Sequence, residues 1–233
     1  MSHEPAKLYY FRGRGRSQQA RWALTVAKIK FENVTLTKSA EFDELCRTGK
    51  LTYQQVPMLE MGGRYISQSM AIVRHAARLG DLYGADAEEA CAIDEVLDGI
   101  TDARNPIVAF PFAQQVEQAT RQLHNAVQRF FPCFELIAER NVANAPFMVG
   151  TRLSIADVLL AELVHSTSEA IRATYGDEAI TSMLEPFKRL RGTYEHVLAL
   201  PEISAFMAGP NWFAFPVGQV GKEYVRNVRE VLN

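Results

Sequence analysis

The order of hydrophobic patterns along the chain is the feature that most constrains its fold. Residues 1–83 interleave short apolar or alternating runs, typical of strands, with amphipathic stretches, whereas residues 84–233 have helical periodicity. The first part is predicted to run strand, helix, strand, short helix, two strands and a helix, which implies a small mixed sheet with flanking helices. We therefore predict the α+β class, with a sheet domain at 1–83 and an all-helical domain at 84–233.

The bounds of the individual elements follow from the period of each pattern and from glycine and proline. Strands are predicted at residues 7–11, 31–36, 56–61 and 64–66, and helices at 17–27, 41–46, 69–79, 88–114, 116–140, from 154 onwards and at 222–232. Gly62-Gly63 marks the turn of a hairpin between the last two strands. Residues 80–85 are the best linker candidate because they contain two glycines and no sustained apolar period.

The composition excludes several classes of protein. With 48% hydrophobic and 22% charged residues among 233, the chain is typical of a globular protein, and no apolar run approaches the roughly 20 residues that span a bilayer. The net charge of −2 gives no general attraction to nucleic acid or anionic membranes. The N-terminus lacks a signal-peptide pattern, and three widely spaced cysteines give no disulfide framework. We expect a cytoplasmic protein with no nucleic-acid or membrane partner.

Motifs for cofactors and metals do not emerge from the sequence. Gly13 and Gly15 lie between a predicted strand and helix, but the third glycine of a dinucleotide fingerprint would fall at Gln18. The five histidines stand apart without a metal-binding spacing, so we expect no metal or redox cofactor. Each of the three cysteines could be a nucleophile, although a small, at least half-buried side chain is the simpler interpretation. They are Cys46, Cys91 and Cys133.

Tyr10 is the second-last residue of the first predicted strand, close to a turn rich in glycine and arginine. A strand aromatic belongs by default to the core, but here the hydroxyl could meet a ligand. A phenol that donates to a thiolate favours the charged form and lowers the thiol pKa from ~8.5 toward neutrality. Arg16 and the helix beginning near Ser17 would add positive potential from the same side. Arginines of this region form either a solvated face or an anion site, and they are Arg12, Arg14, Arg16 and Arg21.

A second cluster of polar groups surrounds Val56-Pro57. Since proline has no N–H, the segment is suited to present the backbone of Val56 to an extended ligand, in particular if the Val56-Pro57 bond is cis. Gln68 and Ser69 stand at the start of the next predicted helix, where free N–H groups and the helix dipole favour a carboxylate. The pattern predicts a site for a small, extended, anionic peptide.

Together these motifs resemble the cytosolic glutathione S-transferases, and they are most similar to the alpha class of the alpha, mu, pi and sigma group. The similarity covers nearly the whole chain. It rests on Lys7-Leu8-Tyr9-Tyr10-Phe11, Gly13-Arg14-Gly15-Arg16, Gln54-Gln55-Val56-Pro57-Met58, Gln68-Ser69, Asp81-Leu82-Tyr83-Gly84, Phe131-Pro132-Cys133-Phe134-Glu135, Phe147-Met148-Val149-Gly150 and Ser154-Ile155-Ala156-Asp157. The resemblance implies a thioredoxin-like N-terminal domain, an all-helical C-terminal domain, a homodimer, and a detoxifying transferase that conjugates glutathione, its co-substrate, to hydrophobic electrophiles.

The resemblance also implies a role for particular residues. Tyr10 matches the thiol-activating tyrosine of the family, and Arg16 matches the arginine that assists it. Tyr53 matches an aromatic key inserted into the partner subunit. We prefer the key to an exposed loop aromatic, which would leave a large apolar group in water. Further glutathione contacts are implied for Arg47, Gln55, Val56, Pro57, Gln68 and Ser69 and, from the other subunit, for Asp102 and Arg129.

Two positions depart from the family pattern. Cys46 stands where alpha-class members commonly carry an arginine for the glycine carboxylate, so either Arg47 or Lys50 could meet that anion. Arg12 replaces a smaller or less charged residue near the pocket for the second substrate. The last helix is a potential lid over this pocket. Ordinary core packing is the alternative for its apolar side chains. The residues predicted to wall the pocket are Phe11, Gly13, Val108, Phe112, Trp212, Phe213 and Phe215.

Other functions of the same fold stay open at this point. A glutathione-dependent peroxidase or isomerase acting on lipids would use the same thiolate as a conjugating enzyme. A non-catalytic ligand-binding or structural protein would retain the fold and lose the activating tyrosine or the glutamyl-binding pair.

Overall fold

Four strands form one mixed sheet, in the order β2-β1-β3-β4, in the computed structural model, which describes residues 4–141 and 146–233. The strands are β1 (Ala6–Phe11), β2 (Phe31–Leu36), β3 (Met58–Met61) and β4 (Arg64–Ser67). Strand β1 is parallel to β2 and antiparallel to β3, and β3 and β4 form the predicted hairpin. Pairing in β3 begins at Met58, two residues later than predicted, because Pro57 has no N–H to donate.

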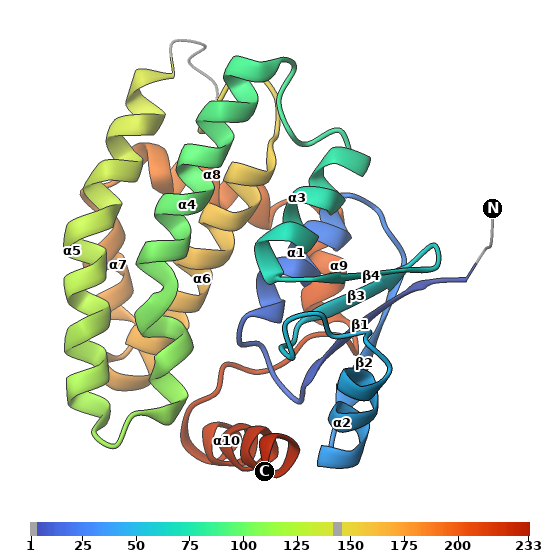
Figure 1. Ribbon diagram of the computed structural model, residues 1–233. Helices are drawn as coiled ribbons and strands as arrows, with labels where there is room; N and C mark the ends of the chain where they lie inside the picture. The colour runs from blue at the N-terminus through green and yellow to red at the C-terminus, as the bar shows by residue number, and fades with distance from the viewer. Residues whose placement is uncertain (1–3, 142–145) are drawn as a thin grey trace. The chain divides into compact units, whose positions relative to one another are not determined.

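Helices cover both faces of this sheet (Figure 1). Helices α1 (Ser17–Val26) and α3 (Ser69–Leu79) pack together on one face, with the Trp22 side chain fully buried. On the other face, α2 (Ser39–Arg47) contacts α10 (Gly218–Leu232). Since β1 is central and its side chains meet helices on both faces, the residues at its end are fixed from two directions. The fold confirms the predicted α+β class with a thioredoxin-like sheet domain.

The remaining helices belong to a second unit. They are α4 (Ala87–Ala109), followed by a 3-10 turn η1 (Phe110–Phe112), α5 (Val116–Arg140), α6 (Ile155–Tyr175), α7 (Glu178–Leu184) and α8 (Lys188–Leu198). Helix α6 contacts α4, α5, α7 and α8 and is buried on nearly every side, as its continuous apolar sequence requires. It begins with a capping box, in which Ser154 and Asp157 satisfy each other's backbone N–H groups.

The chain divides after Gly80, and its last segment returns to the first unit. We call residues 1–80 with 205–233 the sheet unit, and residues 81–204 the helical unit. The prediction assigned all residues after 83 to the helical domain, so this grouping differs from it mainly at the C-terminal segment. Helix α9 (Pro201–Ala208) spans the second junction. No helix within 4–141 and 146–233 combines the length and apolar character needed to cross a membrane.

Candidate active site

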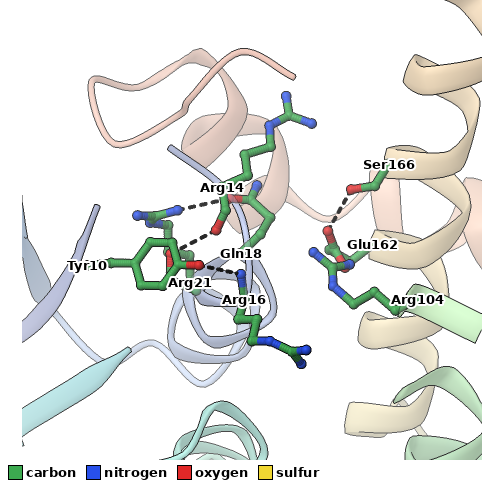
Figure 2. Close-up of polar contacts among 9 residues, drawn as sticks. Tyr10, Arg14, Arg16, Gln18, Arg21, Arg104, Glu162 and Ser166 are labelled. Atoms are coloured by element: carbon green, nitrogen blue, oxygen red, sulfur yellow. Dashed lines mark hydrogen bonds and ion pairs between the residues drawn. The ribbon is translucent and has the colours of Figure 1, made fainter. Parts of the chain in front are cut away.

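Tyr10 lies at the C-terminal end of β1, with only 5% of the residue exposed. Its hydroxyl oxygen accepts a hydrogen bond from the backbone N–H of Arg16, at a distance of 3.0 Å (Figure 2). Arg16 is the N-cap of α1, so the tyrosine oxygen meets the positive end of that helix. The sequence therefore brings Tyr10 and the start of α1 together, through a turn of only five residues.

Gly15 makes this approach sterically feasible. Its φ of +37° lies in a region that L side chains rarely adopt. A Cβ atom at this position would overlap the Tyr10 hydroxyl and would lie 2.5 Å from the hydroxyl of Tyr224. The glycine is needed both for the backbone conformation and for the space that the two phenols occupy.

The arginine cluster does not form a single anion site, because its four members have different surroundings. Arg12 and Arg16 are exposed, whereas Arg14 and Arg21 are buried and bind the scaffold. Arg14 donates from Nε to the Phe213 carbonyl at 2.5 Å and lies over the Trp212 ring at 4.2 Å.

Arg21 is buried, and its guanidinium makes polar contacts at the start of α1, one of them to Gln18 (Figure 2). It donates to the Gly13 carbonyl at 2.9 Å and to Asn33 Oδ1 at 2.8 Å, and it lies over the Phe213 ring at 4.5 Å. Burial lowers the pKa of Arg21 to about 9, against the opposing effect of the nearby Tyr10 and Tyr224 phenols, so the guanidinium is charged at neutral pH. It contributes a fixed positive charge beneath the turn.

Helix α10 supplies two residues that the sequence analysis did not single out. The Tyr224 hydroxyl lies 3.4 Å from the Tyr10 hydroxyl, and both residues belong to one apolar cluster. Asn227 is buried and links the loop after β1 to the end of β2, since it accepts from the Arg12 N–H at 2.6 Å and donates to the Leu36 carbonyl at 2.9 Å. The sequence feature that could have identified these two residues is an asparagine three residues after a tyrosine, on the apolar stripe of the last predicted helix.

The Val56-Pro57 segment lies beside the start of α3. The Val56-Pro57 peptide bond is cis. Gln68, with φ of +72°, immediately precedes α3, and its Nε2 donates to Oε1 of Gln55 at 3.3 Å. Ser69 is the first residue of α3. The structure thus brings Gln55 and Gln68 into contact, and it leaves both side chains exposed.

Helix α2 carries the residues around the departure at Cys46. Arg47 is exposed and forms two bonds with Glu44, from Nε at 2.8 Å and from Nη2 at 2.6 Å. The Lys50 ammonium lies 5.1 Å from the centroid of the Tyr65 ring. Burial, with a contribution from Asp43, raises the pKa of Cys46, which makes its thiol a poorer nucleophile at neutral pH. Cys91 and Cys133 are exposed, contrary to the simpler interpretation of them as buried side chains.

The remaining predicted residues are distributed over the two units. In the sheet unit, Phe11 packs against Tyr10 at 5.0 Å between ring centroids, and Phe215 is buried. Tyr53 is 61% exposed. In the helical unit, Asp102 and Arg129 are exposed, Val108 is half-buried, and Phe112 is 43% exposed. Gly13 is buried, and the Cβ of any other residue at this position would lie only 2.5 Å from the Tyr224 ring. Trp212 and Phe213 serve as faces for the two buried arginines.

This arrangement can stabilise a negative charge next to the Tyr10 hydroxyl. The phenol oxygen is held in place by the Arg16 N–H and keeps a proton to donate, a helix begins beside it, and the buried Arg21 guanidinium bonds to the Gly13 carbonyl of the same turn. Such a set of groups favours the thiolate over the thiol of a bound ligand.

Comparisons with known proteins identify the family. Residues 4–78 match the family model "Glutathione S-transferase, N-terminal domain", and residues 101–210 match "Glutathione S-transferase, C-terminal domain". The chain is 32% identical to Glutathione S-transferase 3 of Gallus gallus over 228 residues, which cover 97% of this chain and 93% of the relative.

Two further comparisons agree with these matches. The chain is 32% identical to Glutathione S-transferase A2 of Homo sapiens, with 88% of each chain covered. The crystal structure of Na-GST-3 of Necator americanus, described as monomeric, has the same fold, with a TM-score of 0.72 at 24% identity over 88% of this chain and 97% of that one. The sequence matches cover most of this chain and show that it belongs to the glutathione S-transferase family.

Proposed function

We propose that this protein binds glutathione, ionises its thiol through the Tyr10 hydroxyl, and adds the thiolate to an apolar electrophile. The observation that carries the proposal is the Tyr10 hydroxyl, held at 3.0 Å by the Arg16 N–H at the start of α1. Because the backbone N–H occupies only a lone pair of the oxygen, the hydroxyl can still donate its own proton to a sulfur atom. Arg16 is the exposed N-cap residue beside it and assists by adding positive charge.

Glutathione is held by the edge of the sheet unit. The backbone of Val56, before cis-Pro57, pairs with the cysteinyl part, and Gln55, Gln68 and Ser69 bind the γ-glutamyl end at the start of α3. The hydrogen bond between the Gln55 and Gln68 amides supports this role, since it fixes two amide groups side by side. The start of α3 favours the glutamyl carboxylate through its N–H groups and dipole.

The glycine carboxylate has two candidate partners, and their surroundings differ. Arg47 can bind it only by sharing or leaving Glu44, whereas Lys50 lies against a neutral ring. Lys50→Ala and Arg47→Ala therefore separate the candidates. Substitution of the true partner should raise the KM for glutathione several-fold without a comparable loss of kcat, because a charge-assisted contact remote from the sulfur contributes mainly to binding.

The active assembly that we propose is a cytoplasmic homodimer with a detoxifying role. Tyr53 inserts into the partner, and Asp102 and Arg129 of one subunit reach the glutathione site of the other. The 61% exposure of Tyr53 in the single chain supports this, because an apolar ring of this size favours burial. Na-GST-3 combines the same fold with a monomeric state, so the assembly must be measured in solution.

The central experiment is the Tyr10→Phe variant, assayed with glutathione and an aromatic electrophile. A hydrogen bond to a charged group contributes about 1.5–3 kcal/mol, so kcat/KM at neutral pH should fall about 10- to 100-fold. The matched control is Tyr9→Phe, since Tyr9 is the adjacent residue of β1 and donates instead to Glu60 at 2.6 Å. Unchanged conjugation by Tyr10→Phe would show that another group activates the thiol.

A substrate panel then distinguishes conjugation from its alternatives. Aromatic electrophiles, lipid hydroperoxides and ketosteroids are each assayed with glutathione, and the proposal expects the largest kcat/KM with electrophiles. Retention on immobilised glutathione and elution by free glutathione test binding by itself. A protein that binds but has no activity with any of these substrates would be a non-catalytic relative.

A further inference from the structure

Tyr224 of α10 places a second phenol beside the first. Its hydroxyl lies 3.4 Å from that of Tyr10, within the same unit, and only 4% of the residue is exposed. The separation is longer than a strong O–H···O bond, which lies at about 2.5–3.0 Å. Such contacts are often long in a ligand-free enzyme and shorten when the reacting group binds.

The position of Tyr224 is fixed by its own helix. Tyr224, Asn227, Val228 and Val231 follow the helical spacing of three and four, and all four are buried. Asn227 bonds both to the loop after β1 and to the end of β2, at 2.6 and 2.9 Å. Helix α10 is therefore anchored to the sheet unit by polar as well as apolar contacts.

Two glycines of the turn leave a slot for the Tyr224 side chain. A Cβ at Gly13 would lie 2.5 Å from one ring carbon of Tyr224, and a Cβ at Gly15 would lie 2.5 Å from its hydroxyl. Any other residue at either position would displace the ring. The turn that carries the thiol-activating site is thus fitted to this particular side chain.

The direction of the hydrogen bonds follows from counting donors and acceptors. A phenol has one proton to donate and two lone pairs that accept. One lone pair of Tyr10 accepts from the Arg16 N–H. If Tyr10 donates its proton to sulfur, its contact with Tyr224 can only be one in which Tyr224 donates. The Tyr10 oxygen then receives two hydrogen bonds, which makes its own proton a stronger donor through cooperative polarisation.

We propose that Tyr224 is a positioning residue for thiol activation, whose hydroxyl donates to the Tyr10 oxygen and strengthens the hydrogen bond from Tyr10 to the glutathione thiolate. This inference rests on the proposed function and deepens it. It assigns to the C-terminal helix a contribution to the chemistry itself. The Arg21 guanidinium also interacts electrostatically with both phenols.

The test is the Tyr224→Phe variant, which keeps the ring that fills the slot and removes only the hydroxyl. Because a single hydrogen bond between neutral groups contributes about 0.5–1.5 kcal/mol, kcat at neutral pH should fall about three- to tenfold. The apparent pKa in the pH profile of kcat/KM should rise by about half to one pH unit. The KM for glutathione should stay within about twofold, since Tyr224 acts through Tyr10 and not on the tripeptide.

The controls separate this role from packing and from the proposed function. Tyr9→Phe also removes one phenol hydroxyl from the sheet unit and should change neither rate nor pH profile. Tyr224→Leu removes the ring as well, so a larger loss than in Tyr224→Phe measures the packing contribution. If Tyr10→Phe lowers conjugation about 10- to 100-fold, as expected, while Tyr224→Phe leaves the pH profile unmoved, only the role of Tyr224 is wrong. If Tyr10→Phe is fully active, the proposed thiol activation itself fails.

One other result would overturn the inference. A Tyr224→Phe variant that binds glutathione more tightly and reacts faster would show that the hydroxyl competes with the thiol for Tyr10. The pH profile of the bound thiol, followed by thiolate absorbance in the ultraviolet, gives the same comparison without an electrophile. An upward shift supports the donation, whereas no shift or a downward shift contradicts it.

Discussion

The buried ion pair between Arg104 and Glu162 allows a quantitative prediction for the helical unit. Arg104 of α4 donates from Nη1 to Oε2 of Glu162 in α6, and the Ser166 hydroxyl donates to the other carboxylate oxygen at 2.7 Å (Figure 2). The two charged side chains are 5% and 1% exposed. Removing one partner therefore leaves the other charge in a dry interior.

We expect Arg104→Met and Glu162→Leu each to lower the free energy of unfolding by about 3–5 kcal/mol, the usual cost of an uncompensated buried charge. For a chain of this size each kcal/mol lowers the Tm by about 2–4 °C, so the expected loss is about 6–20 °C. The double variant should lose less than either single variant, because no charge is then stranded. In the double variant the Ser166 hydroxyl, which has lost Glu162, can donate to a backbone carbonyl of its own helix instead.

The assay is unfolding by heat and by urea, compared over the full double-mutant cycle. The matched control is Arg191→Met, which breaks an exposed i,i+4 pair with Glu195 at 3.7 Å in the same unit. It should change stability by less than about 0.5 kcal/mol. Single variants that each lose less than about 1 kcal/mol, or a double variant whose loss equals their sum, would refute the reasoning.

Three further predictions concern the turn, the capping box and the assembly. Gly15→Ala should lower conjugation at least tenfold, because its Cβ would overlap the Tyr10 hydroxyl, whereas Gly63→Ala, with φ of +75° in open space, should retain activity; both are measured as kcat/KM. Burial raises the pKa of Asp157 from 3.8 to about 6, so the folded state holds its proton more tightly than the unfolded state. Stability that is present below about pH 4 should thus be lost as the pH rises through 6, by about 3 kcal/mol, and Asp157→Asn should remove this dependence in urea titrations at pH 4.5 and 7. Tyr53→Ser should shift sedimentation from dimer to monomer, while Tyr175→Ser, at a similar exposure of 59%, should not.

Elements with a strong period between clear breakers could be predicted from the sequence. The bounds of β2, α3 and α5 coincide with the predicted ranges, because apolar residues recur at fixed spacing up to a glycine, a proline or a polar turn. Helix α7 was not predicted, since its seven residues are too few to establish a period. The final helix begins at Gly218, four residues before the predicted start. Gly218 and Gly221 in its first turn weaken the helical signal of the sequence there.

The candidate site was predictable only where its contacts are local. Tyr10 and the Arg16 N–H are six residues apart, and a strand followed at once by a helix places them together. Tyr10 and Tyr224 are 214 residues apart, and their contact depends on how α10 packs on the sheet. Nothing in the period of α10 determines which residue of β1 its stripe meets. The burial of Arg14 and Arg21 was likewise decided by tertiary contacts, with carbonyls and aromatic rings far along the chain.

The two kinds of contact imply two levels of the thiol activation that we propose. The Arg16 N–H belongs to the same turn as Tyr10, so it holds the hydroxyl whether or not α10 is docked. The Tyr224 hydroxyl reaches Tyr10 only while Asn227 and the apolar stripe hold α10 against the sheet. Loss of α10 should therefore reduce thiol activation without abolishing it. Because Gly13 and Gly15 are shaped to the Tyr224 ring, the turn and the C-terminal helix act as one unit of the site, although they stand at opposite ends of the sequence.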